Sequence, residues 1–271
     1  MKKTTRIIFT LLAVFSLMFF AVGCGSSDNG DGDAVEKYVF ASETSFAPFE
    51  YVDSKSGDTT GFDIELVEAL AEVMDVEIEV RNMNFDGIVG ALESRNVDGA
   101  ISAMTISEKR AKQVDFSDPY YRSDQSVAVR ADNEEITSLN DLEDKKMGCQ
   151  LGTTGEMLAR DVSSDPDNNV TGYDMINDAF MALKNKNIDA VVNDFPVNYY
   201  YIQQGNEDVK IVEVVDTEEH YGMAFPKGSE LVDRVNEGLA TMKENGTYDE
   251  IYEKWFGEAP PAYLPGYPTE E

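Results

Sequence analysis

The feature that most constrains this chain is an alternation of helix and strand patterns that runs through it twice. After a first strand pattern, "KYVFASE", the stretch "GFDIELVEALAEVM" spaces its apolar residues three or four apart, which is typical of an amphipathic helix, and Asp63 is its expected N-cap. "EIEVRNM", "FDGIVGALESRN" and "VDGAISAM" then read as strand, helix and strand. "KKMGCQ", "GEMLARDV", "AFMALKNKN" and "IDAVVND" repeat the alternation further on. The pattern predicts an α/β fold with sheets flanked by helices.

A short internal sequence repeat divides this pattern into two similar units. "ALESRNVDGAIS" begins at Ala91 and "ALKNKNIDAVVN" begins at Ala182, and both run from a helix through Asn-apolar-Asp into a buried strand. Two such units predict two lobes of similar build. Ligands of α/β sheets bind beyond the carboxyl ends of the strands, and residues 103–105 and 194–196 follow the two strands of this repeat. If the lobes face each other, these residues look into one cleft.

Two further stretches, "SDQSVAVR" and "EEHYGMAF", are expected to carry the chain out of the first lobe and back again. The first lobe is therefore predicted to be discontinuous, from 37–121 and 222–257, around a second lobe at 122–221. "LVDRVNEGLATMKENG" is an amphipathic helix pattern that should end near Gly246. The Pro-rich tail, 258–271, is expected to be loosely held.

The N-terminus has the pattern of an export signal. A basic start, "MKKTTR", precedes a largely apolar run of 16 residues and then Gly23-Cys24, and the apolar run is short for a membrane span. Gly23-Cys24 resembles a lipobox, with Ala21 where that pattern usually has Leu. We expect a signal peptide at 1–23, a lipid on Cys24 and a flexible polar tether at 24–36, with ordinary cleavage and release as the alternative. The chain would then be extracytoplasmic, anchored to the cell membrane or periplasmic.

Charge and the scarcity of His and Cys exclude several classes of function. The net charge is −30, which argues against nucleic acid and anionic membrane surfaces as partners. His220 is the only histidine and is expected to be structural, and Cys149 is the only cysteine besides Cys24. No His/Cys metal cluster can form, and no phosphate-binding or dinucleotide-binding motif occurs, so neither a metal nor a cofactor is expected. Cys149 is expected to be a buried thiol.

Three polar positions have a structural and a functional interpretation. Arg110 lies in the first turn of a helix that Ser107 should cap, where a cation is mildly unfavourable, yet its spacing alone also suits a surface residue. Thr153 and Glu156 have the spacing of a capping box, which needs no ligand, although helix N-termini also bind anions. Asp194 could cap a turn.

Eight stretches together resemble one family. They are "ETSFAPFEY", "GFDIEL", "MNFDGIVGAL", "MTISEKRAKQVDFSDPYY", "QLGTTGE", "DAVVNDFPV", "YGMAFPKGS" and "NGTYDEIYEKWFG". The chain from Lys37 to Gly257 resembles the family 3 extracytoplasmic solute-binding proteins of polar amino-acid ABC importers, with the glutamine-binding and histidine- or lysine-arginine-ornithine-binding proteins as the nearest types. The resemblance implies a two-lobed, type II periplasmic-binding-protein-like fold, whose lobes are joined by two crossing segments and close like a hinge.

The resemblance also implies a site that reads the zwitterionic end of an amino acid. Arg110 would grip the α-carboxylate, for which a guanidinium fork is suited. The region of Thr154 would donate to the same carboxylate from the second lobe. Asp194 would pair with the α-ammonium group.

The remaining implied residues surround the ligand's side chain. Phe46 and Phe85 would form aromatic walls, with core packing as the alternative. Glu43 would reach the distal end of the ligand. Gln150 stands where the glutamine-binding type has Lys, and Ala103 stands where relatives have Gly or Ser. The expected ligand-binding set is Glu43, Phe46, Phe85, Ala103, Thr105, Arg110, Gln150, Thr153, Thr154 and Asp194.

The function implied is capture of a free polar or cationic L-amino acid (arginine, lysine or glutamine) and its delivery to the membrane subunits of an ABC permease. The protein would act as a monomer and would not be an enzyme. The alternative is an enzyme similar to cyclohexadienyl dehydratases, with Glu43 as a protonated general acid. A sensor domain is disfavoured, because the sequence shows no second membrane span or signalling module.

Overall fold

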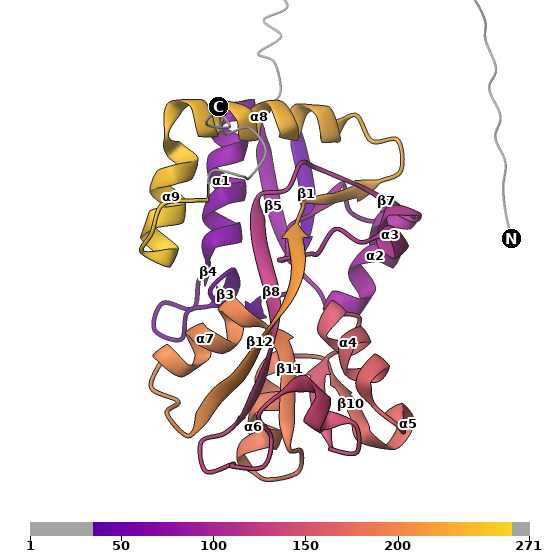
Figure 1. Ribbon diagram of the computed structural model, residues 1–271. Helices are drawn as coiled ribbons and strands as arrows, with labels where there is room; N and C mark the ends of the chain where they lie inside the picture. The colour runs from indigo at the N-terminus through magenta and orange to yellow at the C-terminus, as the bar shows by residue number, and fades with distance from the viewer. Residues whose placement is uncertain (1–34, 262–271) are drawn as a thin grey trace, which may run out of the picture. The chain divides into compact units, whose positions relative to one another are not determined.

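The computed structural model describes residues 35–261, which form two α/β halves joined by two long strands (Figure 1). The predicted signal peptide, Cys24, most of the tether and the tail from residue 262 onward lie outside the described residues. Within 35–261, no helix is both long and apolar enough to cross a membrane. The two halves are called the first and the second lobe below, and the exact lobe boundaries given above stay a prediction.

The first lobe is built on a five-stranded sheet in the order β5-β1-β6-β13-β7. β1 runs parallel to β5 and β6, whereas β13 is antiparallel to β6 and β7. A small sheet of β2, β3 and β4 lies beside it. The strands are β1 (Lys37–Ser42), β2 (Ser45–Phe46), β3 (Glu50–Val52), β4 (Thr59–Thr60), β5 (Glu77–Asn82), β6 (Gly99–Ala100), β7 (Val114–Phe116) and β13 (Ala224–Pro226). The helices are α1 (Phe62–Met74), α2 (Phe85–Glu93), α3 (Glu108–Ala111), α8 (Leu231–Asn245) and α9 (Thr247–Phe256).

The second lobe repeats this plan around a sheet in the order β10-β9-β11-β8-β12. β9 is parallel to β10 and β11, and β8 is antiparallel to β11 and β12. The strands are β8 (Tyr121–Arg130), β9 (Met147–Gln150), β10 (Val170–Tyr173), β11 (Ala190–Asp194) and β12 (Val209–Tyr221). The helices are η1 (Leu139–Leu142), α4 (Thr154–Val162), α5 (Pro166–Asn169), α6 (Ile176–Lys184) and α7 (Phe195–Gln203). Of these, η1, α5 and α7 were not predicted from the sequence.

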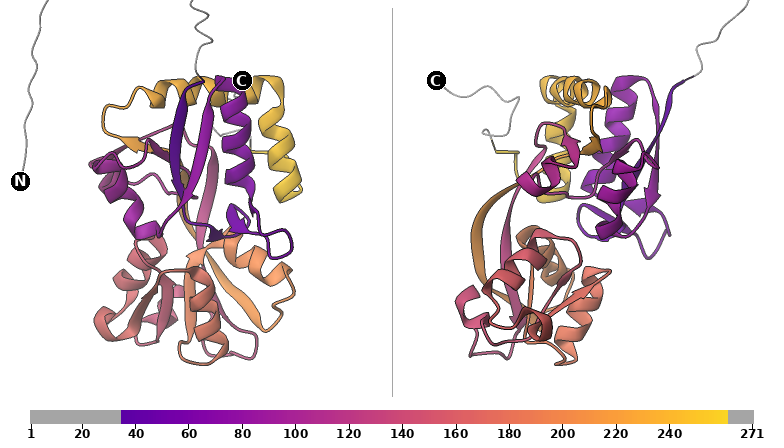
Figure 2. Two further views of the ribbon diagram at one scale, coloured as in Figure 1. Left: turned by 180° about the vertical axis from the view of Figure 1, so that it is seen from behind. Right: turned by 90° about the vertical axis from the view of Figure 1, so that its right-hand side faces the viewer.

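The long strands β8 and β12 connect the lobes, as Figure 2 shows from the side. They pair from Val209–Arg130 at one end to Tyr221–Tyr121 at the other, and the register shifts between Val215 and Glu219. Glu218 has φ 49° there, in the left-handed region that non-glycine residues seldom adopt. Two antiparallel strands that an irregularity interrupts can bend there with little loss of ladder hydrogen bonds.

A large apolar core runs from the first lobe into the second along these strands. At their first-lobe end, the rings of Phe49 and Tyr121 lie 4.9 Å apart and those of Phe49 and Tyr221 5.2 Å apart, both edge to face. Aromatic pairs of this geometry add to the free energy of burial. The beginning of β8 and the end of β12 are therefore fixed to the first lobe.

Two expectations about helix ends can be compared directly with the structure. Ser107 caps α3 as predicted, since its hydroxyl accepts from the Arg110 amide at 3.3 Å. The expected cap of α1 was wrong, because the helix begins after Gly61, whose φ of 140° and close contact with the Phe49 carbonyl exclude a side chain. Asp63 instead lies fully buried inside the first turn.

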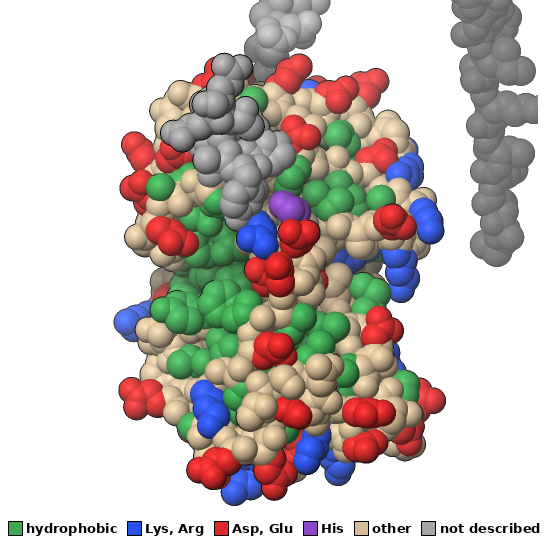
Figure 3. All heavy atoms as spheres, viewed as in Figure 1, with side chains coloured by type: hydrophobic (Ala, Val, Ile, Leu, Met, Phe, Trp, Pro, Cys, Tyr) green, Lys and Arg blue, Asp and Glu red, His purple; other side chains and the backbone are tan. Residues whose placement is uncertain are grey.

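Acidic side chains cover both lobes, with basic side chains between them, on the face shown in Figure 3. This agrees with the net charge of −30. The expected buried thiol is confirmed, since Cys149 has no exposed surface and makes no disulfide, and burial raises its pKa to about 12.

Candidate ligand-binding site

One cavity between the lobes is lined by all ten residues that the sequence pointed to. It holds about 270 Å³ of space outside protein atoms. Its lining comes from β2 and β3, from the carboxyl ends of β1, β6, β9 and β11, and from the first turns of three helices. The lining residues are Glu43, Phe46, Glu50, Phe85, Ala103, Thr105, Arg110, Gln150, Thr153, Thr154 and Asp194. That these residues bind a ligand stays a prediction.

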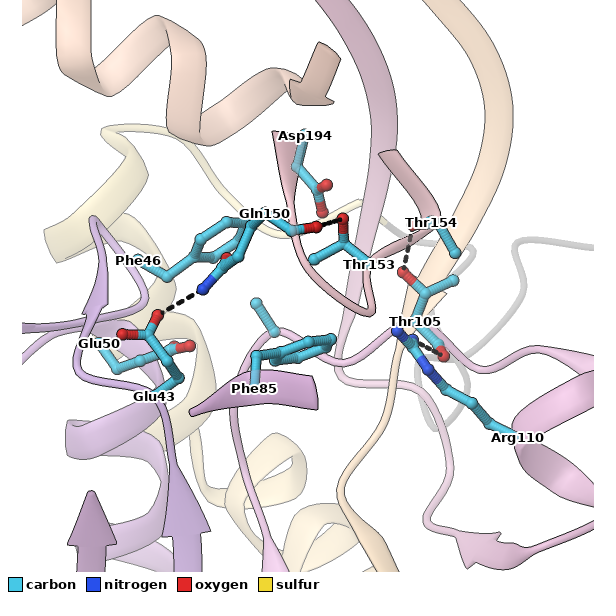
Figure 4. A pocket seen from close by; sticks show the side chains of 11 residues that line it. Glu43, Phe46, Glu50, Phe85, Thr105, Arg110, Gln150, Thr153, Thr154 and Asp194 are labelled. Carbon is cyan, nitrogen blue, oxygen red and sulfur yellow. Dashed lines mark hydrogen bonds between the residues drawn. The ribbon is translucent and has the colours of Figure 1, made fainter. Parts of the chain in front are cut away.

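The two ends of the cavity differ in their ionisable side chains. Figure 4 shows Glu43 and Glu50 together at one end and Arg110 at the other, with Phe85 between them. We call these the acidic end and the Arg110 end. A molecule that fits this cavity would match a negative group to Arg110 and a positive or hydrogen-donating group to the acidic end.

Arg110 is held from both lobes. Its side chain is 6% exposed, and its two terminal nitrogens donate to the Thr105 carbonyl at 2.7 Å and the Gly152 carbonyl at 2.9 Å. The guanidinium also lies over the ring of Phe85, 5.1 Å from its centroid. Burial lowers the pKa of Arg110, while the charges of Asp194 and Glu219 act in the opposite direction. A guanidinium has five N–H donors, so donors remain for an anion in the cavity.

Asp194 lies at the end of β11 and faces the cavity. It precedes α7 but makes no capping hydrogen bond, so the turn-capping interpretation is wrong. Its carboxylate accepts instead from Gln125 Nε2 at 2.8 Å and from the hydroxyl of Tyr221. Burial, and then the nearby Glu219 carboxylate, raise the pKa of Asp194 to about 7. A cationic group beside it would favour its charged form.

The first turn of α4 differs in detail from the predicted capping box. Thr153 caps the helix as expected, because its hydroxyl accepts from the Glu156 amide at 3.1 Å. The Glu156 carboxylate, however, accepts from the Gly152 amide at 2.8 Å and not from Thr153. The Thr154 hydroxyl donates to Glu219 at 2.8 Å, so it cannot donate to a ligand carboxylate. The first-turn amide groups of α4 remain as anion donors, since such groups have no partner within the helix.

At the acidic end, Gln150 connects the lobes. Its Nε2 donates to Glu43 Oε2 at 2.9 Å and to the Asp174 carbonyl at 3.0 Å. Both of its amide protons are therefore used. Burial raises the pKa of Glu43, although its hydrogen bonds oppose this effect.

Glu50 lines the same end and was not identified from the sequence. It has no exposed surface, and its Oε1 accepts from Ser102 Oγ at 2.9 Å. Its Oε2 is buried and accepts no hydrogen bond, although the carboxyl groups of Glu50 and Asp63 can share one when either is protonated. Burial, together with the charge of Asp63, raises the pKa of Glu50 well above its ordinary range. The residue lies in the stretch "ETSFAPFEY", but only the fold shows that it faces the cavity.

Ala103 bends the cavity wall. Its φ is 43°, which a residue with a Cβ adopts only under constraint. Asp63 supplies that constraint, since its Oδ2 accepts from the Ala103 amide at 2.7 Å and from the Tyr120 hydroxyl at 2.7 Å. Asp63, which the sequence predicted as a helix cap, thus supports the site from within the core.

Phe46 and Phe85 both pack in the core and both line the cavity. They are 6% and 9% exposed, and they belong to two apolar clusters, of which that of Phe46 runs through both lobes. That their rings enclose a ligand side chain stays a prediction.

Known proteins resemble this chain over most of its length. A model of the bacterial extracellular solute-binding proteins, family 3, matches residues 38–258. An arginine-binding extracellular protein of Bacillus subtilis is 35% identical over 251 residues, which cover 91% of this chain and 96% of that protein.

Two solved structures have the same fold. An ancestral arginine-binding protein bound to arginine is 45% identical with a TM-score of 0.78, covering 82% of this chain and 98% of that one. An ancestral amino-acid-binding protein, a precursor of cyclohexadienyl dehydratase, is 39% identical with a TM-score of 0.74, covering 81% and 95%. The type II binding-protein fold is therefore confirmed, and the chain belongs to the bacterial extracellular solute-binding proteins, family 3.

Proposed function

We propose that this protein captures a cationic L-amino acid, arginine foremost, outside the cytoplasm and delivers it as a monomer to the membrane subunits of an ABC importer. The observation that carries the proposal is the polarity of the cavity. Arg110 and Asp194 offer a cation and an anion to the zwitterionic end of an amino acid, and Glu43 and Glu50 offer two carboxyl groups to its side chain.

The acidic end favours arginine over the other candidates. Glu50 Oε2 accepts no hydrogen bond from a neighbouring donor, so an ionised Glu50 can accept one from a ligand. A guanidinium is planar and can donate to two carboxylates at once, whereas the lysine ammonium is a compact charge and the glutamine amide is neutral. The arginine-binding relatives support the same choice.

Catalysis on an anionic cyclic acid, the enzymatic alternative, fits this cavity poorly. Such a substrate would lie among the carboxyl groups of Glu43, Glu50 and Asp194, with Arg110 as the one cation lining the cavity. Carboxyl groups of raised pKa do occur there, but each has a binding role in the proposal. We therefore propose a binding protein and not an enzyme.

A thermal-unfolding screen over the proteinogenic amino acids tests the proposed function. A ligand present at a hundred times its Kd adds about 2.7 kcal/mol to the free energy of unfolding. Arginine should give the largest rise in Tm, followed by lysine or glutamine, and glutamate should give none. If no amino acid raises Tm, or if glutamate raises it most, the proposal is wrong.

Ligand binding should release protons. Asp194 has a pKa of about 7 in the free protein, so it is partly protonated at neutral pH and mostly protonated below it. The ligand ammonium needs the carboxylate form and lowers that pKa, so affinity should fall as pH decreases through 7, by up to about tenfold per pH unit for this one group. Calorimetry at pH 6 in buffers of different ionisation enthalpy measures the release.

Citrulline, in which a neutral urea group replaces the guanidinium, separates the two ends of the cavity. It requires Asp194 to ionise but brings no charge to Glu43 and Glu50, whose pKa values burial raises, whereas the arginine guanidinium favours the charged form of both. Arginine should therefore release more protons than citrulline. Equal release, or uptake of protons, would show that the acidic end does not ionise for the ligand.

We further propose that a lipid on Cys24 holds the protein at the outer side of the membrane. Cys24 follows the predicted signal peptide directly, and the only other cysteine, Cys149, is buried. Metabolic labelling with a tagged fatty acid should mark the wild type and the Cys149→Ala control, and Cys24→Ala should lose the label. Persistent labelling of Cys24→Ala would refute the anchor.

A further inference from the structure

A carboxylate behind the cavity wall holds residues of both lobes. Glu219 lies in β12, next to the register shift between the lobes, and is half-buried. Its Oε2 is 2.6 Å from Thr105 Oγ1 of the first lobe and 2.8 Å from Thr154 Oγ1 of the second. Gln125 Nε2 donates to Asp194 at 2.8 Å, and its other proton lies between Glu219 Oε1 and Thr154 Oγ1, each 3.2 Å away. Thr154 Oγ1 keeps a second lone pair for the cavity. Glu219 itself does not line the cavity, whereas Thr105, Thr154 and Asp194 do.

These distances determine where the two hydroxyl protons point. An ionised carboxylate only accepts hydrogen bonds, so Thr105 and Thr154 must both donate to Glu219. A hydroxyl has one proton and two lone pairs. With the proton committed to Glu219, each threonine can present only a lone pair to the cavity. Figure 4 shows the two side chains beside each other at the Arg110 end.

The Arg110 end therefore contains a group of acceptors next to its guanidinium. Thr105 Oγ1, Thr154 Oγ1 and the Asp194 carboxylate can each accept, and an ammonium group has three N–H donors. A 2-hydroxy acid has a single donor at this position, and a des-amino acid has none. Acceptors left without donors in a buried site cost free energy, so such ligands are disfavoured.

We propose that Glu219 is a positioning residue that makes the site selective for an α-ammonium group, because it turns the hydroxyl protons of Thr105 and Thr154 away from the ligand. The inference rests on the proposed amino-acid binding and adds the residue that enforces it. Because Glu219 acts on one residue from each lobe, it can exert this effect only when the lobes are closed.

Glu219→Gln tests the proposal, with Glu218→Gln as the matched control. The glutamine amide can donate to one threonine, whose hydroxyl proton must then turn elsewhere and toward the ammonium. L-arginine should bind about tenfold more weakly or worse. Its des-amino analogue, 5-guanidinopentanoate, should bind Glu219→Gln as it binds the wild type. Glu218 is the exposed neighbour, so Glu218→Gln removes the same charge and should change neither affinity.

Two further measurements separate positioning from structural support. Removal of the Glu219 charge should lower the pKa of Asp194, because that charge is one of the causes that raise it, and the contributions of Tyr221, Gln125 and Arg110 remain. The pH at which arginine affinity begins to fall should therefore move to lower values. Thr154→Val removes one acceptor at nearly the same volume and should reproduce the selective loss for arginine.

Five outcomes decide the matter. Selective loss for arginine supports the proposal, and equal loss for both ligands, or no loss, overturns it. An unshifted pH profile also overturns it, since a purely structural defect would leave the profile in place. If the wild type binds no amino acid at all, the proposed function fails and this inference fails with it, which is a different result from a wild type that binds and a Glu219→Gln variant that binds equally well.

Discussion

Arg110→Ala is expected to weaken arginine binding on the order of a hundredfold, because the ligand carboxylate loses its charged partner and is left buried. The substitution also removes the hydrogen bond from Nη2 to the Gly152 carbonyl, which joins the lobes at 2.9 Å. Both effects act in the same direction, since the first weakens the contact with the ligand and the second destabilises the closed form. Isothermal calorimetry measures the loss.

Lys109→Ala is the matched control for Arg110→Ala. The two residues are adjacent and carry the same charge, but Lys109 is exposed whereas Arg110 is buried. Lys109→Ala should leave Kd almost unchanged. Arg110→Lys should bind nearly as poorly as Arg110→Ala, because one ammonium cannot donate at once to the Thr105 carbonyl, the Gly152 carbonyl and a carboxylate from its position. Small and equal losses for Arg110→Ala and Lys109→Ala would place the ligand elsewhere.

The two lobes surround one cavity, which explains why the residues of the cavity could be predicted from separate stretches of the sequence. A strand ends where its apolar run ends, and in a parallel sheet these ends lie at one edge. The internal repeat therefore predicted that Thr105 and Asp194 would face one cleft if the lobes face each other. The resemblance supplied the roles of Arg110, Phe85 and Glu43, which spacing could not decide. The predicted helix caps at Ser107 and Thr153 were correct, because a cap depends only on nearby residues.

The errors have a common physical origin. Asp63 has the residue type and position of a helix cap, but a buried amide at Ala103 and the hydroxyl of Tyr120 compete for its carboxylate and win. Glu50 and Glu219 look like ordinary solvent-facing acids in a chain of net charge −30. Whether an acid is buried depends on contacts between segments far apart in the sequence. An example is the hydrogen bond between Thr154 and Glu219, which are 65 positions apart. One sequence without relatives does not reveal such contacts.

The second large effect concerns specificity at the acidic end. Glu50→Gln should weaken arginine binding by about tenfold to a hundredfold, because a charged hydrogen-bond acceptor becomes a neutral amide beside the guanidinium. Citrulline, which has the shape of arginine without the charge, should bind the variant as well as the wild type. The ratio of the two affinities should therefore fall, and competitive calorimetry with both ligands measures it.

Folding of the free protein should not suffer from this change. Burial and the Asp63 charge raise the pKa of Glu50 well above its ordinary range, so its surroundings favour the neutral form, which the amide resembles. Glu72→Gln, on the exposed side of α1, removes the same formal charge and should change neither affinity. Equal losses for arginine and citrulline in Glu50→Gln would mean that Glu50 only supports Ser102 and the cavity wall, and that the charge of the ligand side chain is read by Glu43 alone.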